Sequence, residues 1–235
     1  IRDSVLFNML PQDVARLADL DDPSLTRAGD RVKDGWSAAM LYRTVRPPSG
    51  IGPEPRHLEL VDDPSAPFLE GNHVFLSVGA AGEGVANPKL RRMTVSTHIA
   101  VAKLRDATGD EQRLHVQGVQ DRMRRTIARL APEWDVVVRE FTGSARTFRR
   151  WTGRAEGLVG GVPRRAGLGQ YAEVLGTRLP DGLHLVGDSV FPGQSTLAVA
   201  AGGARVAAGI LGRSAARTAP RQVREVSRPS RTPAA

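Results

Sequence analysis

The stretch that decides the fold is residues 183–196, which read Leu-His-Leu-Val-Gly-Asp-Ser-Val-Phe-Pro-Gly-Gln-Ser-Thr. Its first residues are typical of the end of a short buried strand. A Gly-Asp-Ser turn and a Pro-Gly loop follow, and a helix is predicted to begin at Ser195 or Thr196. A strand, a tight loop and a helix N-terminus in succession present backbone N–H groups to a ligand, which indicates an α/β fold.

The helix that follows, over residues 196–211, is predicted to be buried because it is apolar on nearly all sides. It contains Gly202, Gly203 and Gly209, and a glycine in a helix interior costs roughly 1 kcal/mol relative to alanine. Three glycines in one helix are expected only if something else offsets this cost. We therefore expect this helix to pack tightly on a sheet or on a cofactor.

Length and composition set the broad class. A chain of 235 residues can bury a core and suggests one domain or two unequal ones. The absence of cysteine excludes disulfides and thiolate metal sites. No apolar run reaches the roughly 18–20 residues that span a bilayer. Because the sequence begins with Ile1 and not with Met, we expect it to be a segment of a longer protein or a processed product.

The positive charge is concentrated at the C-terminal end. The formal net charge is +8, and residues 205–235 account for +6 of it, with seven arginines and one acid, Glu225. Residues 213–235 are rich in Arg, Ser, Pro and Ala, lack aromatic residues and show no periodicity, so they are expected to be a disordered basic tail. A solvated tail is the simplest interpretation, and no nucleic-acid partner is predicted.

The N-terminal part predicts an α/β unit. Residues 4–8 (Ser-Val-Leu-Phe-Asn) are typical of a short buried strand. Pro11 suits the first turn of a helix that is expected to run to about Leu20. Asp21, Asp22 and Pro23 are expected to end it.

The middle of the chain predicts an antiparallel or mixed sheet. Four β-type runs follow one another without a helix-length segment between them. Asp110 is expected to cap a helix over residues 111–130, which carries one apolar stripe. A further strand over residues 134–141 and two helical turns over residues 144–151 are expected, with Trp151 in the core. The four runs are residues 36–45, 56–61, 73–78 and 93–101.

Two motif matches carry little weight. Gly187-Asp188-Ser189 resembles the signature of a class of esterases with Ser189 as nucleophile, but that mechanism needs a histidine later in the chain and none follows His184. Residues 167–172 fit G-x-G-x-x-A without the strand and helix that the dinucleotide fingerprint requires, so we interpret them as a chance match. No spacing typical of a metal site occurs, and no metal is predicted.

The start of the last helix is the stronger candidate site. Asp188 can accept hydrogen bonds from ligand hydroxyls, and Ser195 can cap the helix. The N–H groups of Thr196, Leu197 and Ala198, together with roughly half a positive charge from the helix, form an electrophilic spot. A reduced flavin carries negative charge at N1 and C2=O, so this position would stabilise it.

At these residues the chain resembles the flavin-dependent phytoene desaturase and carotenoid isomerase family, which includes the retinol saturases. The similarity is most specific in Leu-Val-Gly-Asp-Ser-Val-Phe-Pro-Gly-Gln, residues 185–194. Three weaker segments fall in the family's order, so that the resemblance covers roughly residues 1–212. They are residues 4–17 (its strand and Asn-x-x-Pro helix start), residues 94–98 (its Ser-Thr-His strand) and residues 147–161 with Arg154, Gly157, Gly160 and Gly161 (its Arg-x-x-Gly-x-x-Gly-Gly segment).

The resemblance implies an FAD-dependent oxidoreductase. The implied fold is α/β, the C-terminal part of a two-domain flavoprotein in which Rossmann-like FAD-domain segments are combined with a mixed or antiparallel-sheet substrate domain. Residues 1–30 would be a partial FAD-binding segment, residues 31–155 the substrate domain with its sheet and the helix over 111–130, and residues 156–212 the C-terminal FAD-binding segment. Residues 213–235 would be the tail.

The resemblance also implies cofactor-binding residues. In the family, the aspartate matching Asp188 hydrogen-bonds the ribityl or pyrophosphate part of FAD, and backbone groups matching residues 194–197 face the isoalloxazine ring. Hydride transfer to flavin needs an oriented C–H bond more than a catalytic residue, so no catalytic side chain is named. The expected cofactor-binding residues are Gly187, Asp188, Pro192, Gly193, Gln194, Ser195, Thr196 and Leu197.

Several alternatives stay open at this point. The family's substrates are long apolar polyenes, and desaturation, saturation and isomerisation share one cofactor site. The family's first Rossmann strand and G-x-G-x-x-G are expected to precede Ile1, which makes a missing N-terminal FAD-binding half the expected partner. A cytoplasmic location is expected, with peripheral membrane contact as an alternative. The competing hypothesis is a non-catalytic scaffold or interaction domain with a basic tail.

Overall fold

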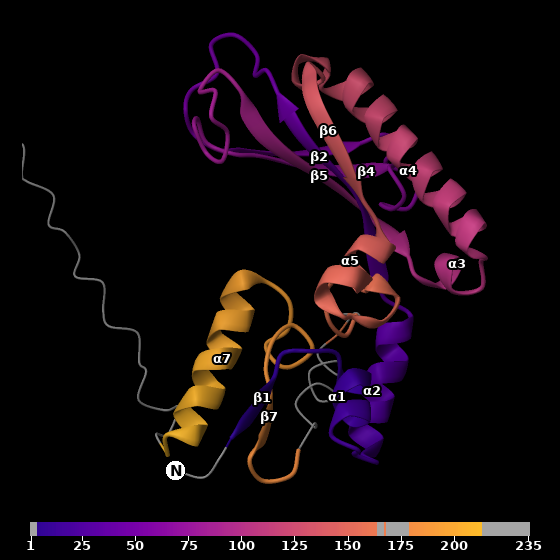
Figure 1. Ribbon diagram of the computed structural model, residues 1–235, viewed down its shortest axis with the longest axis vertical. Coiled ribbons are helices and arrows are strands. Elements are labelled where there is room, and N and C mark those ends of the chain that lie inside the picture. Colours follow the sequence, from indigo (N-terminus) through magenta and orange to yellow (C-terminus); the bar gives the residue numbers. More distant parts are fainter. Residues whose placement is uncertain (1–3, 164–166, 168–178, 213–235) are drawn as a thin grey trace, which may run out of the picture.

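The chain forms two sheets with helices packed on them (Figure 1). The computed structural model describes residues 4–163, 167 and 179–212. One sheet is parallel and the other antiparallel, so the fold is mixed α/β. The predicted tail and most of the 167–172 match lie outside the described residues.

The larger sheet has five antiparallel strands in the order β3-β4-β5-β2-β6. The prediction of an antiparallel sheet is confirmed, and the first three strands begin and end at the predicted residues. The last strand begins later than predicted, because Pro132–Trp134 forms a 3₁₀ turn, η1. The strands are β2 (Trp36–Val45), β3 (Arg56–Val61), β4 (His73–Val78), β5 (Arg91–Ala100) and β6 (Val137–Gly143).

Helix α4 (Gly109–Leu130) covers one face of this sheet (Figure 1), after the short helix α3 (Ala102–Arg105). Of its predicted apolar stripe, Val116, Val119, Met123 and Ile127 are buried against the strands, whereas Leu130 at the end of the helix is 38% exposed. Asp110 is not the cap, which corrects the prediction. Thr108 Oγ1 accepts a hydrogen bond from the N–H of Glu111 at 3.3 Å, and the Glu111 carboxylate accepts one from the N–H of Thr108 at 2.7 Å. This reciprocal capping box satisfies two N–H groups at once.

The smaller sheet pairs β1 (Val5–Phe7) with β7 (Leu183–Leu185) in parallel. Helices α1 (Pro11–Leu17) and α2 (Pro23–Lys33) pack beside it. No other described strand pairs with either outer edge. Strand β1 is less buried than predicted, because Val5 and Leu6 are about half exposed.

Helix α2 was not predicted. The side chain of Asp22 accepts hydrogen bonds from the N–H groups of Ser24 and Leu25, and Pro23 occupies the first turn. Asp followed by Pro is a helix-start signal, and it was misread as the end of the preceding helix.

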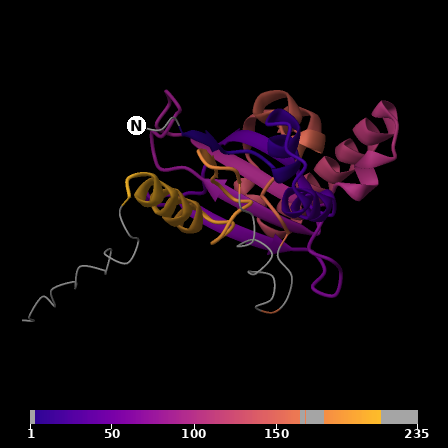
Figure 2. The same ribbon diagram turned by 90° about the horizontal axis from the view of Figure 1, so that it is seen from below.

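The burial predicted for the last helix is wrong. In α7 (Thr196–Ile210) only Gly202 is buried, and Leu197 is 81% exposed. The helix touches the loop before it at Gly202, where a Cβ would lie 3.4 Å from the carbonyl oxygen of Phe191, whereas nothing lies near Gly203 or Gly209. The apolar composition is real, but the described residues cover only one side of α7 (Figure 2).

Helix α5 (Ala145–Thr152) follows β6, and the predicted two turns are confirmed. Gly153 ends it with a φ of 69°, and the 3₁₀ turn η2 (Ala155–Gly157) comes next. Trp151 is 77% exposed, so its placement in the core was wrong. It lies in the last turn, with the Arg150 guanidinium 5.5 Å from its ring centre. None of the described helices is long and apolar enough to cross a membrane.

Candidate functional site

The loop between β7 and α7 is placed by the parallel pairing of β7 with β1. The N–H of Val186 donates to the carbonyl of Phe7 at 2.9 Å and extends that pairing by one residue. Gly187 then turns the chain with a φ of 104°, and a Cβ there would clash with the side-chain oxygen of Asn8. This geometry places Asp188 at the carboxyl end of a parallel strand, where open α/β sheets bind ligands.

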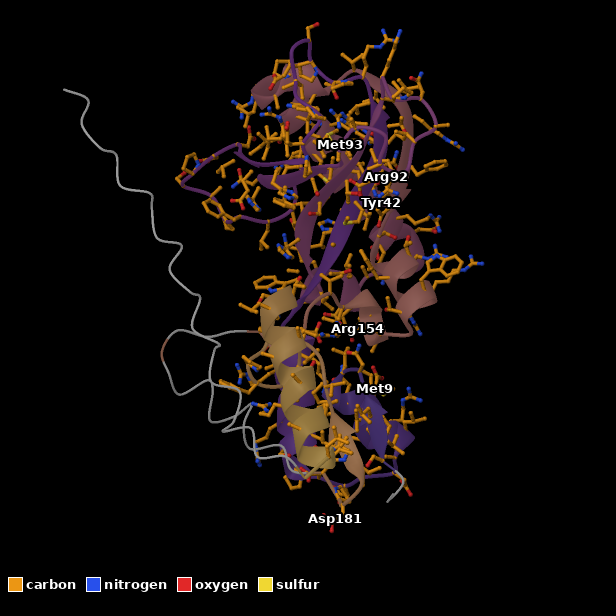
Figure 3. All side chains as sticks on the ribbon, turned by 90° about the vertical axis from the view of Figure 1, so that its left-hand side faces the viewer. Met9, Tyr42, Arg92, Met93, Arg154 and Asp181 are labelled. Carbon is orange, nitrogen blue, oxygen red and sulfur yellow. The ribbon has the colours of Figure 1, made fainter. Side chains whose placement is uncertain are left out.

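Asp188 is held by Arg154. The Nη2 group of Arg154 lies 3.0 Å from both carboxylate oxygens, and its Nη1 group donates to the carbonyl of Gly160 at 2.7 Å. The Arg154 and Asp188 side chains are 18% and 20% exposed. A carboxylate has about four lone-pair positions, so Asp188 can still accept hydrogen bonds from a ligand. Figure 3 shows Arg154 between the two sheets.

Two glycines allow this close packing. Any Cβ at Gly161 would clash with the backbone carbonyl of Asp188, so only glycine fits beside the loop. Gly160 has a φ of 78°, and a Cβ there would lie 2.9 Å from the side-chain nitrogen of Gln194. The segment around Arg154 is therefore fixed against both ends of the 187–194 loop.

Ser195 connects the loop to α7 in an unusual conformation. Its φ of 121° and ψ of 154° are largely restricted to glycine, and such a conformation costs of order 1–3 kcal/mol. The predicted cap is confirmed, because Ser195 Oγ accepts from the N–H of Ala198 at 3.2 Å. Ala198 is consequently not free to bind a ligand, which corrects the prediction. Among the described residues, no group accepts from the N–H of Thr196 or Leu197.

A pocket of about 610 Å³ opens at this place. Of the eight predicted residues, Asp188, Gln194, Ser195 and Thr196 line it, whereas the other four support the loop or lie beside it. Arg154 belongs to the segment that resembles the family's Arg-x-x-Gly-x-x-Gly-Gly, but it was not predicted as a site residue. That spacing of one arginine and three glycines is the sequence signal that could have identified it. The lining residues that the prediction missed are Gly160, Val199 and Ala200.

The esterase alternative finds no support in the geometry. Ser189 is only 4% exposed, and its hydroxyl lies 3.5 Å from an Asp188 oxygen. The structure describes all five histidines, and none of them forms a hydrogen bond with Ser189 among the described residues. The nucleophile and base of that mechanism are therefore not assembled.

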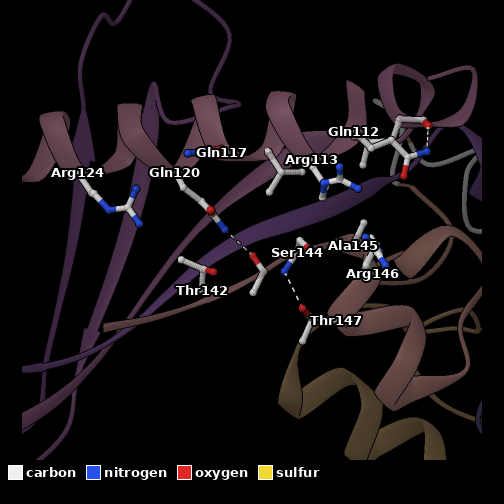
Figure 4. A pocket seen from close by; sticks show the side chains of 13 residues that line it. Gln112, Arg113, Gln117, Gln120, Arg124, Thr142, Ser144, Ala145, Arg146 and Thr147 are labelled. Carbon is white, nitrogen blue, oxygen red and sulfur yellow. Dashed lines mark hydrogen bonds between the residues drawn. The ribbon is translucent and has the colours of Figure 1, made fainter. Parts of the chain in front are cut away.

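A second pocket, of about 550 Å³, lies between α4, β6 and α5 (Figure 4). Gln120 in its wall donates to the carbonyl of Gly143 at 3.0 Å. Arg124 is bound to Glu140 and Asp121, so its charge is compensated. The lining mixes apolar and polar side chains, and it contains no pair of groups suited to acid–base or nucleophilic chemistry.

Curated proteins with a similar segment are all named as isomerases of one carotenoid. The chain is 41% identical over 69 residues to prolycopene isomerase 2, chloroplastic, of an Oncidium hybrid cultivar. It is 44% identical over 72 residues to the chloroplastic prolycopene isomerase of Arabidopsis thaliana and 40% over 68 residues to that of Daucus carota. Each similarity spans 29% of this chain and 11–12% of the relative's length. No family model matches the chain.

Proposed function

We propose that the chain is part of an FAD-dependent oxidoreductase that isomerises or desaturates an apolar, isoprenoid-type polyene. The observation that carries the proposal is the local identity of 40–44% to prolycopene isomerases. The pocket between Asp188 and the start of α7 supports it, because it offers the acceptor and donors that a flavin needs. Since the similarity spans only 11–12% of those relatives, the activity of the whole enzyme is part of the proposal.

The residues of the pocket fit part of FAD. Ligand sites usually measure about 300–1,000 Å³, and the pocket of about 610 Å³ falls in that range. Asp188 would accept hydrogen bonds from the hydroxyls of the ribityl arm, held in place by Arg154. The N–H groups of Thr196 and Leu197 would donate to a flavin carbonyl, with the partial positive charge of the helix start behind them. When bound, FAD supplies the ring that accepts or donates hydride.

The face of the five-stranded sheet opposite α4 would receive the substrate. Met40, Tyr42 and Phe141 lie on it, with Tyr42 directly opposite Phe141. These two rings are 37% and 54% exposed and offer apolar area to a polyene. The pKa of His98, on the same face, is lowered first by burial and then by the charge of His73, so its ring is neutral at pH 7. The exposed Arg92 and Arg139 share this face, and the Arg139 guanidinium lies 4.4 Å from the centre of the Phe141 ring, so the apolar area adjoins cationic groups.

The smaller sheet would be completed by further polypeptide. Parallel sheets normally have both faces covered and more than two strands. Strands β1 and β7 have no further described partner, and α7 leaves much of its apolar surface uncovered. We propose that an N-terminal FAD-binding half with the G-x-G-x-x-G supplies the missing layer.

Equilibrium dialysis against FAD tests the proposed site. The protein extended by the proposed N-terminal FAD-binding half is compared with its D188N variant, which keeps the shape of the side chain and removes its charge. Losing a charge-assisted hydrogen bond should weaken FAD binding about tenfold. D181N is the matched control, because Asp181 is an exposed aspartate in the turn before β7 (Figure 3). It should bind FAD like the parent chain.

Two outcomes would contradict the proposal. One is that the protein extended by the proposed N-terminal FAD-binding half retains no FAD at all, which would favour the scaffold hypothesis. The other is that D188N and D181N lose the same affinity, which would remove Asp188 from the site. Chromatography of the isomers formed from prolycopene, with and without FAD, then tests the substrate class separately.

A further inference from the structure

Helix α5 carries three arginines on one side and no acid. At 100° per residue, Arg146, Arg149 and Arg150 fall within about 100° of arc. All three side chains are exposed, and within the described residues none forms an ion pair. Of the ten arginines on the larger sheet and α4, five pair with a carboxylate, as Arg43 and Arg124 do with Glu140. No carboxylate of the described residues compensates the charge on α5.

An exposed tryptophan adjoins this charge. Trp151 is 77% exposed, although a side chain of this size is usually buried on average. Arg150 lies over its ring, and Gly153 ends the helix directly after it. Phe148, three residues earlier, is half-buried and anchors the helix on the fold. The exposed ring therefore stands at a fixed helix end beside the Arg150 guanidinium, whereas Arg146 and Arg149 lie about 140–160° away from it around the helix axis.

We infer that α5 is a docking helix for an anionic lipid surface. Arginine side chains reach the phosphate level with their charged ends, while tryptophan prefers the boundary between headgroups and acyl chains. The charge pattern favours lipid over an acidic protein, because the tryptophan needs an apolar medium beside the phosphates. This inference goes beyond the proposed function and does not depend on flavin.

Sedimentation with lipid vesicles tests the inference on the 235-residue chain. Vesicles contain phosphatidylcholine alone or with a third of phosphatidylglycerol. Each arginine near an anionic surface should contribute roughly fivefold, so R146Q/R149Q/R150Q should bind the anionic vesicles about a hundredfold more weakly. The matched control is R46Q/R56Q/R125Q, three exposed arginines on other elements that pair with no described carboxylate. It should lose far less affinity.

Tryptophan emission provides a second measurement. Anionic vesicles should shift the emission of the parent chain to shorter wavelength, and W151A should remove most of this shift, because Trp134 is buried and Trp36 is less exposed than Trp151. The inference is overturned if both triple variants lose equal affinity, if emission is the same with and without vesicles, or if pure phosphatidylcholine binds equally well. Binding of a single-stranded oligonucleotide through α5, without vesicle binding, would likewise overturn it.

Discussion

The tightest backbone contact of the candidate site is at Gly161, whose Cα faces the carbonyl of Asp188. We predict that G161A pushes the 187–189 turn away from this segment, because neither backbone can yield without losing the Arg154 pair. FAD retention in equilibrium dialysis should fall at least tenfold. Thermal unfolding should show a loss of about 1–3 kcal/mol, typical of overpacking.

The control for this substitution is G203A in α7. Nothing lies within 4 Å of the position where its Cβ would be placed. Because alanine is favoured over glycine in a helix, G203A should stabilise the chain by up to about 1 kcal/mol and leave FAD retention unchanged. Equal FAD retention in both variants would show that the contact at Gly161 does not shape the pocket.

Residue types predicted some positions of the site but not their partners. Ser195 was expected as a cap because serine accepts from a helix N–H, and the structure confirms it. The pairing of Arg154 with Asp188 could not be predicted, because it joins side chains far apart in the sequence. Trp151 was misplaced because hydrophobicity alone does not say whether a neighbouring element covers a ring.

Glu140 connects two strands of the larger sheet with the helix that covers it. It accepts from Arg43 on β2 at 2.6 Å and from Arg124 on α4 at 2.6 Å, while lying on β6. We predict that E140Q destabilises the chain by about 2–3 kcal/mol, because the side chain of Arg43 is buried and keeps only Asp135 as a partner. Urea unfolding measures this, with the exposed Glu133 as the control site in E133Q.

The same network makes the stability depend on pH. Burial would raise the pKa of Glu140, but hydrogen bonds from Arg124 and Arg43 outweigh it and hold the pKa below the usual 4.5. The carboxylate therefore contributes its full stabilisation above pH 4.5 and loses it as the pH falls through the lower folded-state value. The difference between parent and E140Q should shrink between pH 7 and pH 3. If the difference in the free energy of unfolding between parent and E140Q stays constant over this pH range, the charge of Glu140 does not contribute to stability.

Elements were predicted best where the local signal was complete. Strands β2, β3 and β4 match at both ends, because β-branched and aromatic runs were bounded by Pro, Gly and Asp. Helix α4 was predicted from its apolar stripe, but its N-cap is Thr108, two residues before the predicted cap Asp110. Helix α2 was missed because its start signal, Asp22 followed by Pro23, also fits the end of α1.

The two sheets should differ in local stability. Among the residues that the structure describes, the core under the larger sheet holds 17 buried side chains, whereas the cluster at the smaller sheet holds five. We predict that backbone amides of β1 and β7 exchange with deuterium at least a hundredfold faster than those of β2 and β5, since less apolar area holds them. Hydrogen exchange followed by mass spectrometry measures this. Equal protection in both sheets would mean that the chain opens only as one cooperative unit.

The arrangement of the whole molecule was the hardest part to predict. The antiparallel sheet follows from consecutive strands, whereas the β1–β7 pair joins Val5 to Leu183 at opposite ends of the chain. The burial of α7 was predicted from its apolar composition. Composition shows that a helix surface can be buried, but it does not show whether a neighbouring element covers that surface. Its uncovered side is consistent with the proposed N-terminal half.

Among the described residues, no further strand pairs with β1 or β7, and this has a practical consequence for handling the polypeptide. Unused amide and carbonyl groups along an edge will bond to whichever extended segment reaches them first. In a concentrated preparation the segment that pairs with the edge would come from a second copy of the chain. The exposed apolar side chains of α7 would then pack between the two copies. Dilute storage, or co-expression with a segment that fills the gap, would therefore keep the material homogeneous.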